Sequence, residues 1–104
     1  MEPINTKAYS IFHSEVSKCI LSLETIFSHT PTAEELKSAR IATHRLKGGA
    51  GFFGLDGLGK TGGNVEQLIL TDQAQSKKEI EIIQELIAKL KVLATEMPPP
   101  TTVV

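Results

Sequence analysis

The stretch LKSARIATHRLKGGAGFFG, residues 36–54, carries the pattern that decides the fold. Its apolar and small residues recur in steps of three and four, the spacing that places side chains along one face of an α-helix. The positions on that face are Leu36, Ala39, Thr43, Leu46, Ala50 and Phe53. Gly54 follows them, and glycine commonly ends a helix because it accepts the left-handed conformation. The stretch therefore predicts an amphipathic helix that ends near residue 53, with Leu46 and Phe53 buried.

The same period occurs on both sides of this stretch. Between Pro3 and Pro31 it marks a long helix. We expect its buried face to hold Ile4, Ala8, Ile11, Phe12, Val16, Cys19, Ile20, Leu23, Ile26 and Phe27. The predicted helices cover residues 4–29, 32–53, 56–72 and 77–97. No segment alternates with the period of two that a half-buried strand shows, so the fold class is all-α. Four amphipathic helices with short connections predict an antiparallel up-down four-helix bundle.

Capping residues indicate where two of these helices begin. Thr30 caps the second helix if Pro31 is its first residue, whereas Thr32 forms a capping box with Glu35. Both starts fit the sequence. Ser76 repeats the capping-box pattern, with a glutamate three residues later, before the last helix.

Length and composition limit the possible functions. A chain of 104 residues has room for one domain, expected at residues 1–97, with 98–104 as a proline-rich tail or the start of a linker. The net charge of −1 argues against a nucleic-acid-binding protein, and no apolar run is long enough to span a membrane. The N-terminus has no secretory signal, and a single cysteine fits a reducing compartment, so we expect a cytoplasmic protein. Cys19, His13 and His29 lack the spacing of metal ligands, so no metal site is expected.

All eight glycines lie between residues 48 and 63, where two nucleotide-binding patterns match. Gly54 to Thr61 fit G-x-x-x-x-G-K-[ST], with Lys60 as its lysine, and residues 49–54 fit G-x-G-x-x-G. Both patterns need a buried strand before the loop, so that backbone amides converge on the phosphates. The preceding residues have helical periodicity instead. We therefore interpret both matches as coincidental.

His44 has unusual surroundings. It lies one residue after the core position Thr43, at the edge of the buried stripe, and Arg40, Lys47 and Gly48 share its helix face. Residues 36–63 carry five cations against one acid, a net charge of +4. This charge favours an anionic ligand or an acidic partner near His44.

Three of the glycines lie inside the helix that carries His44. A glycine in a helix costs about 0.5–1 kcal/mol relative to alanine, so Gly48, Gly49 and Gly51 need a compensating role. We expect them to clear space beside His44 for the backbone of another protein.

Residues 42–54, ATHRLKGGAGFFG, resemble the phosphorylation-site segment of histidine-containing phosphotransfer (HPt) domains, above all the N-terminal domain of CheA-type chemotaxis histidine kinases. The similarity covers about residues 39–70 and includes Asn64-Val-Glu66-Gln-Leu68, in which Glu66 takes the place of the family's acidic residue on the neighbouring helix. The pattern is specific, because it combines a histidine, a lysine three residues later, two following glycines and this glutamate. Gly63 departs from it, since chemotaxis relatives commonly have a second histidine there. We expect this departure to alter the phosphorylation rate without removing the acceptor.

The resemblance implies a phosphorelay intermediate of two-component signalling rather than an enzyme with its own ATP site. His44 would accept a phosphoryl group from a histidine kinase or a receiver aspartate and pass it to an aspartate of a response regulator. Glu66 would orient the imidazole, and Lys47 would contact the phosphoryl group or the partner. The residues assigned to binding are Arg40, Arg45, Gly48, Gly51 and Gly63. ATP and Mg²⁺ would be supplied through the partner domains, with no cofactor bound by this one.

Two other functions fit parts of the sequence. A non-catalytic four-helix adaptor would carry His44 as an ordinary surface residue. A small P-loop nucleotide-binding protein would use Lys60 and Thr61. The proline-rich end also fits the excised front domain of a longer histidine kinase, and no partner is named by the sequence.

Overall fold

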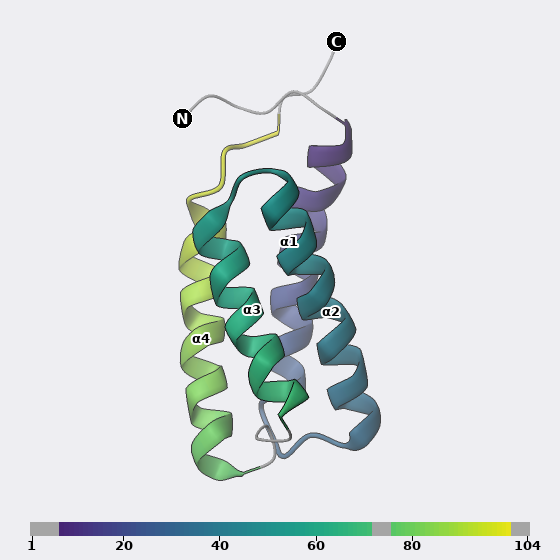
Figure 1. Ribbon diagram of the computed structural model, residues 1–104, viewed down its shortest axis with the longest axis vertical. Coiled ribbons are helices and arrows are strands. Elements are labelled where there is room, and N and C mark those ends of the chain that lie inside the picture. The colour runs from purple at the N-terminus through teal and green to yellow at the C-terminus, as the bar shows by residue number, and fades with distance from the viewer. Residues whose placement is uncertain (1–6, 72–75, 101–104) are drawn as a thin grey trace.

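The computed structural model describes residues 7–71 and 76–100, and this part of the chain forms four α-helices. They are α1 (Lys7–Ile26), α2 (Ala33–Phe52), α3 (Asp56–Leu70) and α4 (Lys77–Thr95). Successive helices run in opposite directions along the long axis of the molecule (Figure 1). The predicted all-α, up-down four-helix bundle is therefore confirmed.

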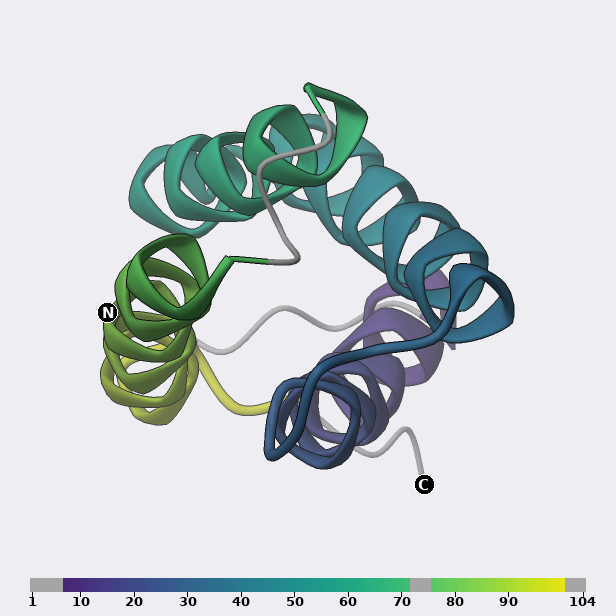
Figure 2. The same ribbon diagram turned by 90° about the horizontal axis from the view of Figure 1, so that it is seen from below.

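Each helix packs against two others, so that the four stand at the corners of a square (Figure 2). The diagonal pairs, α1 with α3 and α2 with α4, have no Cα atoms within 8 Å of each other in the described residues. The core between the helices is formed by Tyr9, Val16, Ile20, Leu23, Ile26, Phe27, Ala39, Leu46, Ala50, Leu58, Val65, Ile69, Ile80, Ile83, Ile87, Leu90 and Met97. The pair α2 and α3 packs most extensively. Side chains on the adjoining outer edges of these two helices therefore come close together.

The start and end of α2 follow from local signals. Thr32 Oγ1 accepts a hydrogen bond from the Glu35 amide at 3.1 Å, and the Glu35 carboxylate accepts one from the Thr32 amide at 3.0 Å. This capping box makes Thr32 the cap, so Pro31 stays outside the helix. Gly54 has a φ of 72°, the left-handed conformation that the sequence predicted for the residue ending this helix.

Two predicted helices extend too far. α1 ends at Ile26 rather than at residue 29, because the Ser28 hydroxyl bonds back to the Thr25 carbonyl and Pro31 disfavours helical backbone just before it. α4 ends at Thr95 rather than at residue 97, since Pro98 imposes the same restriction. The predicted limits at residues 4 and 72, and the core position at residue 4, lie outside the described residues.

The first turns of α1 also differ from the prediction. Ala8 and Ile11 are exposed, whereas Tyr9, which the sequence analysis did not place in the core, is fully buried. The Tyr9 ring meets Phe53 edge-on, with centroids 5.1 Å apart, and its hydroxyl donates a hydrogen bond to the Pro98 carbonyl. These two partners are far away in sequence. They decide which side of the helix faces inward.

An aromatic cluster closes this end of the bundle. Phe53 stacks on Phe12 with ring centroids 5.4 Å apart. The expected burial of Leu46 is confirmed at 3% exposure, but Phe53 is only partly buried because it covers the rim of the core. The cluster fixes where α2 ends relative to α1.

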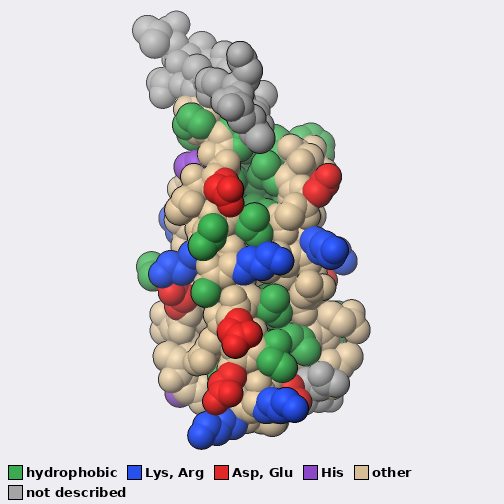
Figure 3. Space-filling model, turned by 90° about the vertical axis from the view of Figure 1, so that its left-hand side faces the viewer, with side chains coloured by type: hydrophobic (Ala, Val, Ile, Leu, Met, Phe, Trp, Pro, Cys, Tyr) green, Lys and Arg blue, Asp and Glu red, His purple; other side chains and the backbone are tan. Residues whose placement is uncertain are grey.

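The α4 side of the bundle shows no concentration of one charge. Basic and acidic side chains are interspersed with hydrophobic ones there (Figure 3). Lys91 of α4 pairs with Glu24 of α1 at 2.9 Å, an exposed ion pair of a kind that contributes little to stability. This face gives no indication of a charged ligand.

Candidate functional site

His44 lies in the middle of α2, and its side chain is 77% exposed. Its Nδ1 atom is 2.9 Å from Oε2 of Glu66, which α3 brings alongside. An ionised carboxylate only accepts hydrogen bonds, so Nδ1 carries the proton and donates it. In the neutral ring the other nitrogen, Nε2, then keeps its lone pair. The ring is thus held in one orientation with a nucleophilic nitrogen that solvent and partners can reach.

Glu66 is a nearly buried carboxylate with only 10% of its side chain exposed. Its Oε2 atom accepts the His44 hydrogen bond, and its Oε1 atom lies 3.8 Å from Nζ of Lys47. A buried charge is tolerated when it is paired in this way. The structure therefore brings together the three residues that the sequence analysis assigned to the centre of the site.

A shallow hollow of about 350 Å³ adjoins the histidine. It is lined by Arg40, Ile41, His44, Arg45, Glu66 and Leu70. Its lining includes two arginines against one carboxylate, an excess of positive charge that suits a group carrying negative oxygens. Ile41 and Leu70 were not predicted to lie at the site. Both are apolar residues outside the core stripe and strongly exposed, which is the signal that could have identified them.

The glycines of α2 have two different roles. A Cβ atom added at Gly48 or Gly51 would meet nothing within 4 Å, so these positions leave open space beside His44. A Cβ atom added at Gly49 would lie 2.3 Å from Cε1 of Phe12 in α1. The prediction that Gly49 clears space for a partner is therefore wrong. Gly49 instead allows α1 to pack against α2, because it faces inward, 100° around the helix from Gly48.

The two nucleotide-binding patterns lack the structure they require. Residues 49–54 belong to α2 and its end, and the segment before them is helix rather than strand. Thr61 is buried within α3, and its hydroxyl donates to the Gly57 carbonyl at 2.9 Å. A P-loop needs that hydroxyl for a metal ion and needs a strand before the loop. The P-loop alternative is contradicted by this geometry.

The remaining histidines have other surroundings. His29 pairs with Glu35 at 3.0 Å in an exposed position next to the α2 cap, and His13 lies against the Tyr9 ring with centroids 5.9 Å apart. In the described ranges 7–71 and 76–100, no three or more His, Cys, Asp or Glu side chains are grouped so that they could hold a metal ion. Of the three histidines, His44 is the one whose ring is hydrogen-bonded to a buried carboxylate in the described residues.

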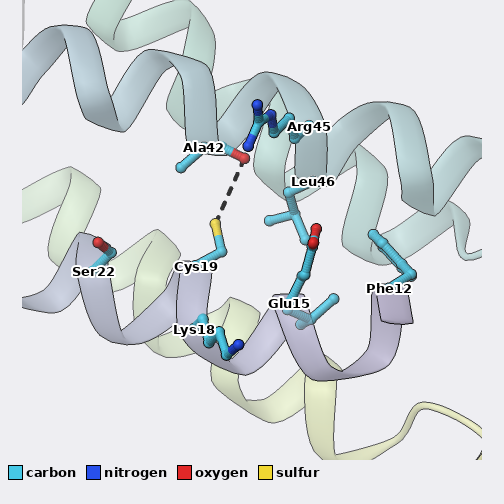
Figure 4. Close-up of a pocket in the computed structure, with 9 residues that line it drawn as sticks. Phe12, Glu15, Lys18, Cys19, Ser22, Ala42, Arg45 and Leu46 are labelled. Carbon is cyan, nitrogen blue, oxygen red and sulfur yellow. Dashed lines mark hydrogen bonds between the residues drawn. The ribbon is translucent and has the colours of Figure 1, made fainter. Parts of the chain in front are cut away.

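A second hollow, of about 300 Å³, lies between α1 and α2 (Figure 4). Cys19 lines it, and its thiol donates to the Ala42 carbonyl at 3.6 Å. Burial raises the pKa of this thiol to about 11. The thiol is therefore protonated at neutral pH, and Cys19 is a poor nucleophile. Arg45 lines both this hollow and the one beside His44.

Comparison with known proteins gives one match. The family model of the Hpt domain matches residues 7–96. No curated protein and no solved structure matches the chain. Within the described residues, no helix is both long and apolar enough to cross a membrane. Members of the Hpt domain family transfer phosphoryl groups through a histidine in two-component signalling. They work with histidine kinases and response regulators and have no catalytic ATP site of their own. Because the match spans all four helices and the paired histidine, the chain belongs to this family.

Proposed function

We propose that His44 is the phosphoacceptor, receiving a phosphoryl group from a histidine kinase or a receiver aspartate and passing it to an aspartate of a response regulator. The observation that carries this proposal is the 2.9 Å hydrogen bond from His44 Nδ1 to the nearly buried Glu66 carboxylate. Such a bond fixes the tautomer of a reactive imidazole and stabilises the positive charge that it gains. His29 has an exposed partner at a helix cap and no comparable setting.

In the forward step, the lone pair of His44 Nε2 attacks phosphorus, and the bond from phosphorus to the donor oxygen breaks. The leaving oxygen takes the electron pair of that bond. The ring keeps its Nδ1 proton, which Glu66 continues to accept. Lys47 and the guanidinium groups of Arg40 and Arg45 offset the negative charge of the phosphoryl oxygens.

The partners would supply what this reaction needs besides the histidine. ATP comes from the kinase, and Mg²⁺ is held by the acidic pocket of the receiver. That acidic pocket matches the cations around His44, so opposite charges steer the two proteins together. With such partners we expect a cytoplasmic protein, with residues 1–97 as the phosphotransfer domain and residues 98–104 as a tail or linker. Neither nucleic acid nor a membrane takes part.

The small donor phosphoramidate tests the acceptor without a cognate kinase. The full chain is incubated with phosphoramidate, and the modified residue is mapped by mass spectrometry at neutral pH, where phosphohistidine survives. We expect one acid-labile phosphoryl group, on His44. Modification confined to His13 or His29, or spread evenly over the three histidines, would contradict the proposal, since the exposed ring oriented by the nearly buried Glu66 should react faster than the other two histidines.

Replacing Glu66 with alanine should slow phosphorylation of His44 by about ten- to a hundredfold, the effect of losing one hydrogen bond to a charged group. The rate is measured with phosphoramidate, and circular dichroism checks that the helices remain. Glu66→Gln is the matched control, because its amide oxygen still accepts from Nδ1 while the charge is lost. An unchanged rate in Glu66→Ala would remove Glu66 from the mechanism.

Gly48→Leu should separate docking from chemistry. Leucine at this open position strengthens the helix by about 0.5–1 kcal/mol, but its side chain stands beside His44 where a partner backbone would approach. We expect normal labelling by phosphoramidate and at least about tenfold slower transfer to a receiver domain. Gly48→Ala, which adds only a methyl group, should transfer nearly as fast as the wild type. If transfer is unaffected by leucine, Gly48 does not provide clearance.

A further inference from the structure

Gly63 lies on α3 directly beneath the side chain of Lys47. A Cβ atom added at Gly63 would lie 3.4 Å from Cδ, 3.6 Å from Cε and 4.0 Å from Cγ of Lys47. The neighbouring Gly62 faces a different residue, since its Cβ atom would meet Leu46 at 3.2 Å. Two adjacent glycines therefore serve two purposes. Gly62 accommodates a core side chain, and Gly63 accommodates the methylene chain of a surface cation.

The Lys47 side chain extends past Gly63, and its ammonium group lies near the carboxylate of Glu66. Nζ lies 3.8 Å from Oε1, which is too far for a direct hydrogen bond, and the Lys47 side chain is 57% exposed. An exposed ion pair of this length holds a side chain only weakly. Long cationic side chains are held instead by packing their methylene groups against the protein while the charged end stays in water. Gly63 leaves the room in which the methylene chain of Lys47 lies along α3, since a Cβ atom there would already touch Cδ of that chain.

We infer that Gly63 is a positioning residue: the absence of a side chain there lets Lys47 lie across α3, with its ammonium beside the carboxylate that orients His44. This inference rests on the proposed function, in which Lys47 offsets charge on the phosphoryl group. A methyl group at residue 63 would make an ordinary contact with Cδ of Lys47. A longer side chain would occupy the volume of the lysine stem and turn the ammonium into solvent.

The test uses phosphoramidate, so that partner docking plays no part. Nε2 of His44 forms a bond to phosphorus, the bond between phosphorus and nitrogen of the donor breaks, and the protonated donor nitrogen leaves as ammonia. The rate constant is measured by ³¹P NMR on the full chain for the wild type, Gly63→Ala, Gly63→Leu, Lys47→Met and the double variant Gly63→Leu/Lys47→Met.

We expect Gly63→Ala to lose less of the rate than Gly63→Leu, because its methyl group only touches Cδ of Lys47. Lys47→Met and Gly63→Leu should each be slower by about five- to tenfold, the effect of one charge-assisted contact at an exposed site. The double variant should be no slower than Lys47→Met, because Gly63 acts only through that lysine. Asn64→Leu places the same side chain at the next, exposed position of α3 and should leave the rate unchanged. If Gly63→Leu fails to fold, Gly63→Gln replaces it in the series, since its side chain is flexible and polar.

The outcomes separate this inference from the proposed function. A wild-type chain that phosphoramidate does not modify at His44 would overturn both. Modification at His44 with a wild-type rate in Gly63→Leu would overturn the role of Gly63 alone. A wild-type rate in Lys47→Met would overturn the roles of both Gly63 and Lys47, while His44 would remain the acceptor. The role of Gly63 would also be overturned if Gly63→Leu slowed the Lys47→Met variant as much as it slows the wild type. Such additive effects would mean that Gly63 acts independently of Lys47.

Discussion

Replacement of His44 by glutamine is expected to abolish phosphorylation, leaving only the background signal of a sample without a phosphoryl donor. Glutamine has no nitrogen lone pair that attacks phosphorus, because the amide nitrogen is conjugated with its carbonyl. The same amide still donates a hydrogen bond to Glu66, and the position is exposed. The free energy of unfolding should therefore change by about 1 kcal/mol or less. Loss of labelling with an intact fold then identifies the acceptor.

The measurement is labelling by phosphoramidate, repeated with a histidine kinase catalytic domain and ATP. His13→Gln and His29→Gln are the matched controls, since each removes an imidazole from a different part of the chain. Both should be labelled like the wild type. Label that persists on His44→Gln, or that disappears in either control, would overturn the assignment of His44.

Alanine substitutions at Gly48 and Gly49 should have opposite effects on stability. At Gly49 the new methyl group would overlap the Phe12 ring, which is itself stacked on Phe53. Overpacking of this kind costs about 1–3 kcal/mol and exceeds the gain in helix propensity of about 0.5–1 kcal/mol. At Gly48 the methyl group meets nothing, so only the gain remains. The two variants should differ by about 2 kcal/mol in the free energy of unfolding.

Urea denaturation followed by circular dichroism measures both free energies of unfolding under the same conditions. The comparison is sharp because the two substitutions are chemically identical and occupy neighbouring positions of α2. Phe12→Leu in the Gly49→Ala background should restore part of the lost stability, since it removes the ring that the methyl group meets. Equal stabilities for Gly48→Ala and Gly49→Ala would show that α1 does not pack against Gly49 as described.

Much of the fold could be predicted because helical periodicity and caps are local signals. The core stripe of α2 and its end at Gly54 follow from residues within one or two turns of each other. The start of α1 could not be predicted in the same way. Ala8 and Ile11 are as apolar as a core requires, but the contacts of Tyr9 with Phe53 and Pro98 turn a different side of the helix inward.

The candidate site likewise has a part that local sequence signals predict and a part that depends on tertiary contacts. His44, Lys47 and Gly48 lie on one helix, so their shared face follows from helix geometry. Glu66 is 22 residues away, and its place opposite His44 came from the family resemblance, because spacing alone does not show which faces of two helices meet. The different roles of Gly48 and Gly49 depend on where α1 packs, which is tertiary information.

The hydrogen bond between Tyr9 and Pro98 has a practical consequence for engineering. It joins the first turn of α1 to the segment after α4, so the two ends of the described bundle meet at one pole, while His44 lies midway along the side. A domain whose ends adjoin can be spliced into a surface loop of a host protein without being stretched. Inserted in this way, the bundle would present its histidine to the side, away from the host.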